Sequence, residues 1–374
     1  MGIYKREVKK EHVNALVRKI KENISQPLRI MEICGGQTHA LLKYGIQELL
    51  GDKITMIHGP GCPVCVTPQN IIDKAFDLSL EKNIIMTTFG DMARVPGSKG
   101  SLLYAKSFGA DIRILYSPLD IFQIASENND KEIVFFSIGF ETTAPIHALA
   151  IKYAFDNDIQ NVSFLTSLVT VPAALKYLLS DRDAEIDGIL GAGHVCAVSG
   201  YEDYEKLAEE FKVPISITGF EPEELLLGIL NCVNLIVKGE HCVINSYPEV
   251  VVRKGNEKAI GLINEVFDVF DNNWRGLGVI PKSGLIINKK YEHYNSALRF
   301  KISDKDVIIN VDCRAGEIMR GKLQPNECSL FGRLCNPDNP QGASMVSSEG
   351  ACAAYYLYSR NIVNLIGNRK DVLF

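Results

Sequence analysis

The sequence lacks any excess of positive charge. Its 374 residues include 40 Lys and Arg against 45 Asp and Glu, which gives a net charge of −5. A protein without a basic surplus has little with which to neutralise phosphates, so we expect no nucleic-acid partner.

Long hydrophobic runs are also missing. The most apolar stretch, Leu225 to Val237, contains Asn231 and Asn234 and is too short to cross a bilayer. The N-terminus has no apolar core of a secretory signal, and Arg6 stands where a myristoylation signal needs Ser or Thr. We therefore expect a cytoplasmic protein with no membrane partner.

Several common catalytic motifs are absent too. The chain has no Walker loop, no GxSxG elbow and no GxGxxG after its first predicted strand. It does have ten cysteines, and in a reducing compartment clustered cysteines bind metal or react more often than they form structural disulfides. Cys232 and Cys242 are not part of a recognisable cysteine motif, and we interpret them as packing residues.

Short apolar runs alternate with helical patterns, which is typical of parallel strands covered on both faces. The predicted strands are Leu28–Ile33, Ile54–Ile57, Asn83–Thr88, Asp111–Tyr116, Glu132–Ile138, Val162–Leu168, Ile186–Leu190 and Pro214–Thr218. Helices are predicted between them, among others at Gln69–Leu80, Ile146–Phe155 and Glu223–Val233. The fold class is thus α/β, either a closed barrel or two doubly wound domains.

A repeated pattern favours two domains. Ile138–Glu141 and Thr218–Glu221 share the ending Gly-Phe-Glu at a strand-to-helix boundary. We predict one α/β domain over 25–125 and a second over 126–245. Residues 1–24 and 246–374 form the third domain, with a helix near Glu257–Phe270 and a Gly/Pro-rich stretch over Trp274–Gly284.

The first candidate site is Cys34 in the motif CGGQTHA, directly after a predicted strand. Ligands bind at the carboxyl ends of strands in open α/β sheets, and a following helix N-terminus favours the thiolate form that binds metal. The alternative is a buried cysteine in a tight turn.

The second candidate site is the pair Cys62 and Cys65 in GPGCPVC, next to a helix start. Two cysteines at this spacing form a redox-active disulfide or share a metal ion. Structural zinc is the alternative, with Cys34, His39 and His58 near enough in sequence to complete a site.

The third candidate site is C-terminal. Four cysteines within about forty residues suit a four-thiolate site for zinc or an iron–sulfur cluster. They are Cys313, Cys328, Cys335 and Cys352.

Two polar motifs follow other predicted strands. Glu141 lies in GFETTAP at a helix entrance, where a capping role is the alternative to a catalytic one. His194 and Cys196 lie in GAGHVC at another strand end, and a structural histidine is the alternative there.

Taken together, five motifs resemble the HypD family of hydrogenase maturation factors over nearly the whole chain. They are CGGQTHA, GPGCPVCVTP, GFETTAP, GAGHVCAVSG and ECSLFGRLCNPDNPQGASMVSSEGACAAYY. The resemblance implies two related doubly wound parallel-sheet domains facing a cleft, plus a third domain that carries an iron–sulfur cluster. It also implies a scaffold on which the Fe(CN)₂CO group of [NiFe]-hydrogenase is assembled, rather than a conventional turnover enzyme.

The resemblance assigns roles and partners as well. Cys34 would hold the iron with a cysteine of the small chaperone HypC, and HypE would supply cyanide from a thiocyanate. Cys62 and Cys65 would be a redox dithiol, and the four C-terminal cysteines would hold a [4Fe–4S] cluster. His194, Glu141 and Glu349 are candidate cleft residues.

Chemistry agrees with these roles. Release of cyanide from a thiocyanate takes two electrons, and a dithiol gives two electrons on becoming a disulfide.

The main alternative function is a thioredoxin-type oxidoreductase that uses the CPVC pair on a protein disulfide. A third possible function is that of a structural zinc protein.

Overall fold

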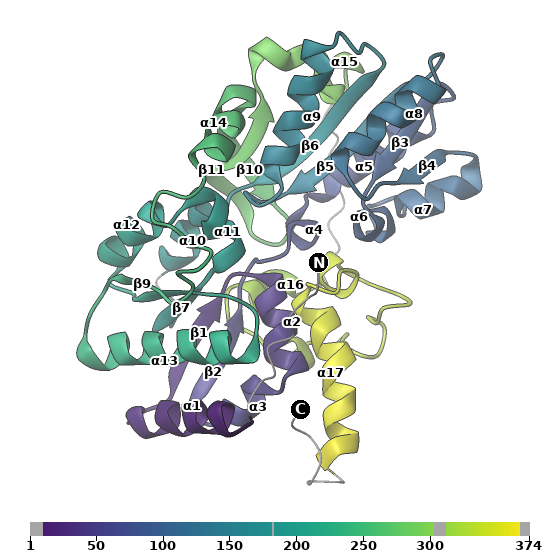
Figure 1. Cartoon of the computed structure of the whole chain (residues 1–374). Coiled ribbons are helices and arrows are strands. Elements are labelled where there is room, and N and C mark those ends of the chain that lie inside the picture. Colours follow the sequence, from purple (N-terminus) through teal and green to yellow (C-terminus); the bar gives the residue numbers. More distant parts are fainter. Residues whose placement is uncertain (1–9, 182, 303–311, 367–374) are drawn as a thin grey trace.

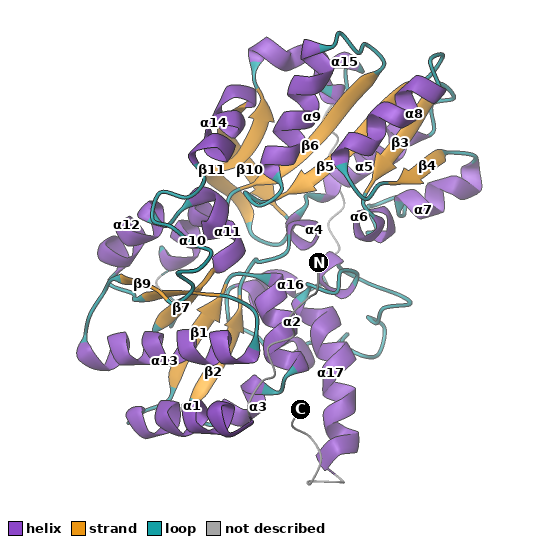
Figure 2. Cartoon of the chain, viewed as in Figure 1, coloured by secondary structure: helices purple, strands orange, loops and turns teal. Residues whose placement is uncertain are grey.

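The computed structural model describes residues 10–181, 183–302 and 312–366, with side chains up to residue 358. Two separate sheets, each covered by helices, make up the molecule, and the short helix α4 lies between them (Figures 1 and 2). Both sheets are open, so the barrel alternative is wrong. The prediction of an α/β fold is confirmed.

The first sheet, called sheet A, has the order β2-β1-β7-β8-β9, and every neighbouring pair is parallel. Its strands are β1 (Leu28–Glu32), β2 (Ile54–His58), β7 (Gly188–Ala192), β8 (Ile215–Thr218) and β9 (Val243–Asn245). Strands β1, β7 and β8 are buried almost throughout, which explains their apolar sequences.

The second sheet, sheet B, has the order β10-β11-β6-β5-β3-β4. Its strands are β3 (Ile84–Thr88), β4 (Asp111–Ile114), β5 (Glu132–Gly139), β6 (Val162–Val169), β10 (Phe267–Trp274) and β11 (Gly278–Ile287). Strands β3 to β6 are mutually parallel, whereas β10 and β11 form an antiparallel hairpin that pairs with β6.

All eight predicted strands are confirmed, with ends that differ by at most two residues. Their distribution between the sheets does not follow chain order, however. Segment 25–125 contributes β1 and β2 to sheet A but β3 and β4 to sheet B, and segment 126–245 is divided in the same way. Apolar runs show that a strand is buried on both faces, but they do not show which strand lies beside it.

The described helices lie before, between and after the strands. They are α1 (Lys10–Asn23), α2 (Gly35–Lys43), α3 (Ile46–Leu50), α4 (Pro63–Val66), α5 (Gln69–Ser79), α6 (Gly90–Arg94), α7 (Leu102–Ala105), α8 (Ile121–Glu127), α9 (Ala144–Asp156), α10 (Val171–Leu179), α11 (Gly193–Ser199), α12 (Glu202–Phe211), α13 (Pro222–Lys238), α14 (Glu257–Val266), α15 (Ser296–Arg299), α16 (Ala315–Met319) and α17 (Ala351–Ile366). The helices predicted at α5, α9 and α13 are confirmed. In the described part of the chain, no helix combines the length and apolarity that a bilayer crossing requires.

Two parts of the predicted third domain belong elsewhere. The helix expected to reach Phe270 ends at Val266, and the chain continues as β10 and β11 in sheet B. The N-terminal helix α1 packs on α13 along one face of sheet A (Figure 1), through an apolar stripe that includes Leu16 and Ile20. Among the described residues, the stretch 312–366 contributes no strand to either sheet, and its helix α17 packs on α2.

Candidate metal centre

Cys34 lies between the end of β1 and the start of α2, where it is only 2% exposed. Its backbone N–H donates to Glu32 Oε2 at 2.8 Å. Gly36 allows the ring of Phe220 to approach, because a Cβ there would lie 2.9 Å from that ring. The predicted strand-end position of the thiol is therefore confirmed.

The CPVC loop packs directly on the backbone of Cys34. The N–H of Gly35 donates to the carbonyl of Gly61 at 2.9 Å, and a Cβ at Gly61 would overlap the Cα and N atoms of Cys34. Because Gly61 immediately precedes Cys62, the two cysteine motifs meet at one place.

Cys62 and Cys65 are joined by a disulfide, with 5.3 Å between their Cα atoms. Cys62 is the N-cap of α4, and its Sγ accepts a hydrogen bond from the N–H of Cys65 at 3.2 Å. The side chains are 3% and 5% exposed. This geometry permits a reversible dithiol at the start of a helix.

The other side of the CPVC loop contacts the C-terminal segment. Helix α4 packs on the short helix η5 (Ala343–Met345), and Cys65 Sγ lies 3.9 Å from the carbonyl of Ala343. The preceding residue, Gly342, lies against Cys313, since a Cβ there would overlap its Sγ. The dithiol loop is therefore in contact with both Cys34 and the four-cysteine segment.

The four C-terminal cysteines lie close enough to influence one another. Burial raises the pKa of the Cys352 thiol well above its usual value, and the charges of Cys313, Cys335 and Cys328 raise it further. Burial also raises the pKa of Cys335, with additional contributions from Cys313 and Cys328. Four thiolates this close repel one another, and positively charged irons would offset that repulsion, so the donor set fits an iron–sulfur cluster.

The mixed zinc site predicted as an alternative does not form. His39 Nε2 lies 2.9 Å from the hydroxyl of Tyr358, and His58 bonds Glu32 and Tyr355. Over the described residues, no three His, Cys, Asp or Glu side chains are placed to hold a single metal ion.

His194 begins α11 and lies beside Cys34. Its Nδ1 and Nε2 atoms are 3.7 and 3.9 Å from Cys34 Sγ. Burial lowers the pKa of His194 to about 4, so its ring is neutral at pH 7 and its unprotonated nitrogen can accept a hydrogen bond or bind metal. Cys196, two residues further, is fully buried and has its pKa raised to about 12 by burial.

The expectation that Cys34 is a thiolate is wrong for the metal-free protein. Burial raises the pKa of this thiol, and the charges of Glu32 and Glu349 add to the effect. The N–H groups of Gln37 and Gly36 act in the predicted direction and lower the pKa, but burial outweighs them. Binding of a metal must therefore displace the thiol proton.

Glu349 and Glu141 are placed differently. A Cβ at Gly35 would overlap the Cβ and the carbonyl oxygen of Glu349, so Glu349 lies beside the Cys34 loop. Burial raises the pKa of the Glu349 carboxyl, and the charge of Asp91 raises it further.

Glu141 Oε1 accepts a hydrogen bond from the N–H of Val171 at 2.8 Å, so it caps α10 rather than its own helix. The capping alternative for Glu141 is thus supported, although its second oxygen is buried without a partner.

Comparison with known proteins covers nearly the whole chain. A family model described as "HypD: Hydrogenase formation hypA family" matches residues 11–359. The chain belongs to the HypD family. It is 43% identical over 349 residues to hydrogenase maturation factor HypD of Escherichia coli K12, which covers 93% of this chain and 94% of that protein.

Other HypD relatives agree. The identity is 44% over 343 residues with HypD2 of Bradyrhizobium diazoefficiens, covering 90% of each chain. It is 45% over 338 residues with HypD of Rhizobium leguminosarum bv. viciae, covering 88% of each. The resemblance seen in the five motifs is confirmed, and membership of the HypD family supports a role in hydrogenase maturation.

Sequence reasoning missed Glu32 and the role of His58 in this HypD-family site. Glu32 is fully buried at the end of β1 and its carboxylate bonds Cys34, Thr38 and His58. A charged residue directly after the buried apolar residues Ile30 and Met31 was the available signal, because such a group is buried only with partners. The half-buried Arg275 was missed too, and its backbone N–H donates to the carbonyl of Val66 at the end of α4.

Replacing Gly61 with alanine should destabilise the protein. The new Cβ would overlap backbone atoms of Cys34, so the loop or β1 must shift, at a cost of roughly 1–3 kcal/mol. Urea unfolding measures the loss. The matched control is Gly261→Ala in α14, where a Cβ meets no atom within 4 Å and the helix should gain up to about 1 kcal/mol. Equal stability of Gly61→Ala and the parent would contradict the close contact.

Glu141 should make stability fall with rising pH. Burial raises its pKa to about 7 from 4.5, so the folded state holds this proton more tightly than the unfolded chain does. The stability that this proton provides is therefore lost as pH rises from about 4.5 to about 7. Glu141→Gln keeps an acceptor for Val171 but does not titrate. At pH 8 it should be more stable than the parent by roughly 3 kcal/mol, with a smaller difference at pH 5. Unfolding at both pH values tests this, and a pH-independent difference would contradict it.

Proposed function

We propose that this protein is a scaffold and redox protein for assembly of the Fe(CN)₂CO group of [NiFe]-hydrogenase. One observation carries the proposal: the Gly61 backbone lies against Cys34, which puts the CPVC dithiol beside a candidate iron-binding thiol. The C-terminal cysteines meet the same loop from the other side.

Iron, the cargo, would be held by Cys34 together with the N-terminal cysteine of a HypC-type chaperone. A soft iron that carries cyanide and CO suits thiolate ligands. The thiol must lose its proton on binding, and the neutral ring of His194, whose Nδ1 lies 3.7 Å from the sulfur, can accept a hydrogen bond from the thiol before that loss. Because that ring is neutral, it does not repel the incoming cation.

Cyanide would come from the thiocyanate of a HypE-type donor. Cleavage of its S–C bond needs two electrons and leaves a thiolate on the donor and cyanide for the iron. Oxidation of Cys62 and Cys65 to a disulfide supplies two electrons and releases two protons, of which one can go to the donor thiolate. The disulfide between Cys62 and Cys65 supports this step, because it shows that the two sulfurs lie close enough to form the bond.

The dithiol must then be reduced again. A resident [4Fe–4S] cluster held by the four C-terminal cysteines would supply single electrons to it. The protein's own contribution is the contact of α4 with η5, which brings the disulfide next to the segment that contains Cys335 and Cys352.

Infrared spectroscopy tests the proposal directly. The protein co-purified anaerobically with its HypC-type partner should show cyanide and CO stretching bands, together with iron and acid-labile sulfide. A complex that contains zinc without iron or sulfide, and that lacks these bands, would sink the assembly role.

A thioredoxin-type oxidoreductase remains the second candidate, favoured by the formed Cys62–Cys65 disulfide. Both sulfurs belong to almost fully buried residues, whereas an enzyme that attacks protein disulfides needs an accessible thiolate. Turnover of a protein disulfide that does not depend on Cys34 would favour this candidate.

A further inference from the structure

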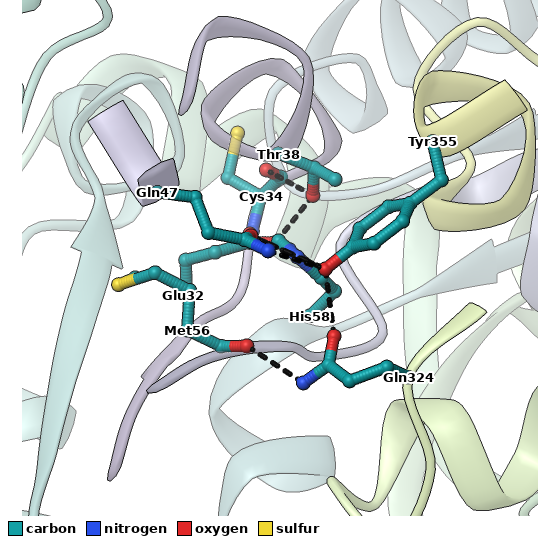
Figure 3. Close-up of polar contacts among 8 residues, drawn as sticks. All are labelled: Glu32, Cys34, Thr38, Gln47, Met56, His58, Gln324 and Tyr355. Atoms are coloured by element: carbon teal, nitrogen blue, oxygen red, sulfur yellow. Dashed lines mark hydrogen bonds and ion pairs between the residues drawn. The ribbon is translucent and has the colours of Figure 1, made fainter. Parts of the chain in front are cut away.

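A buried polar network lies behind Cys34 (Figure 3). We call it the Glu32 network, and it consists of Glu32, Thr38, Gln47, His58, Gln324 and Tyr355. The carboxylate of Glu32 accepts hydrogen bonds from the N–H of Cys34 and from the hydroxyl of Thr38, and His58 Nδ1 lies 2.8 Å from its Oε1. Glu32 thus bonds the backbone of Cys34 just before α2 and the side chain of Thr38 within α2.

The network continues from His58 to the C-terminal segment. His58 Nε2 lies 3.2 Å from the hydroxyl of Tyr355, which accepts from Gln47 Nε2 at 2.8 Å and donates to Gln324 Oε1 at 2.7 Å. Gln324 Nε2 in turn donates to the carbonyl of Met56 in β2 at 3.1 Å. The far end of the network is therefore anchored in sheet A.

Two members of the network are near the C-terminal cysteines in sequence. Tyr355 follows Cys352 by about one turn of α17, and Gln324 lies just before Cys328. A continuous path of hydrogen bonds therefore joins the amide of Cys34 to the segment that carries two of the four C-terminal thiols.

The hydrogen bonds of the Glu32 network should hold its members in a rigid geometry. A buried carboxylate is tolerated only when its oxygens are hydrogen-bonded, and bonds to a charged group are stronger than bonds between neutral groups. A buried network in which the members satisfy one another holds its atoms in one arrangement, while a missing member leaves costly unpaired groups.

We propose that Glu32, His58 and Tyr355 are positioning residues for Cys34. They hold its amide, and so the direction of its thiol, and they tie that direction to the segment with the C-terminal cysteines. The importance of this direction rests on the proposed iron-holding role of Cys34, but the mechanical link itself does not.

The variant Tyr355→Phe tests the link. It removes one hydroxyl and keeps a ring that is only 3% exposed. Loss of the bonds to His58 and Gln324 should make amide hydrogen exchange about tenfold faster in the peptide that covers residues 33–38, measured by mass spectrometry on the protein without iron. In the HypC-type complex, the cyanide bands should shift or broaden while the cluster absorbance stays unchanged.

Tyr358→Phe is the matched control. Its hydroxyl also joins α17 to a histidine of α2, with 2.9 Å to His39 Nε2, but it is outside the Glu32 network. Exchange at 33–38 should remain as in the parent. Equal acceleration by both variants would mean that α17 packing alone holds Cys34, and acceleration by neither would show that no link exists, so either result overturns the proposal.

Glu32→Gln is the second variant if Tyr355→Phe does not fold. It keeps the shape of the side chain but weakens the acceptor for the Cys34 amide, and it should accelerate exchange in the same peptide. Because exchange is measured without iron or partners, its result is separate from the assembly role. Missing infrared bands in the parent complex would sink the proposed function, whereas unchanged exchange would sink the positioning link.

Discussion

Replacing Cys34 with serine is expected to abolish the cyanide and CO infrared bands of the HypC-type complex. A hydroxyl keeps the size of the side chain, but it is a poor ligand for a soft iron and does not ionise at neutral pH. The bands should fall to below roughly one tenth of those of the parent, since one missing thiolate of two weakens capture by an order of magnitude or more. The proposed C-terminal cluster should keep its absorbance, because the four cysteines that would hold it are elsewhere in the chain.

The control for Cys34→Ser is Cys232→Ser. Cys232 is also fully buried, but it packs against Gly188 and the carbonyl of Ile189 in β7. Its replacement should leave the bands intact. Full bands in Cys34→Ser would contradict the iron-holding role, and protein-disulfide reduction that persists in the same variant would favour the thioredoxin-type alternative.

Replacing Cys352 with alanine is expected to remove the proposed [4Fe–4S] cluster. Its thiol is affected by the charges of all three other C-terminal cysteines, which identifies it as a member of the same donor group. A site with three thiolates holds a four-iron cluster poorly, so the variant should lose most of its iron, its sulfide and the visible absorbance of the cluster. Without that electron supply, the Cys62–Cys65 disulfide should also resist reduction.

Cys242→Ala is the control for the cluster. Cys242 is an exposed cysteine outside the donor group. Iron and sulfide contents should match those of the parent. If Cys352→Ala retained its full content, a ligand set without Cys352 would be required, and the role proposed for the four cysteines would need revision.

The position of the site follows from the way the chain passes between the sheets. Strand β2 belongs to sheet A and the next strand, β3, belongs to sheet B, so the segment between them must cross. The CPVC loop and α4 form the first part of this crossing (Figure 1). Because the loop leaves the end of β2, which is the neighbour of β1, it meets Cys34 at the end of β1.

The sequence by itself determined the α/β class, the eight strands, the strand-end position of Cys34 and the family. Each of these depends on local patterns: apolar runs, glycine after a strand, and motifs of a few residues. The cysteine motifs could be located in this way because only cysteine carries a thiol, so every candidate thiolate ligand is visible in the sequence.

Only the tertiary structure decided how the strands are shared between the sheets and which groups meet at the site. The hairpin β10–β11 joined sheet B and α1 joined sheet A, because both choices depend on long-range packing partners that periodicity does not encode. The protonation state of Cys34 also depends on long-range contacts. A helix start favours the thiolate locally, but burial by distant residues and the charges of Glu32 and Glu349 raise its pKa, and the total is a property of the folded molecule.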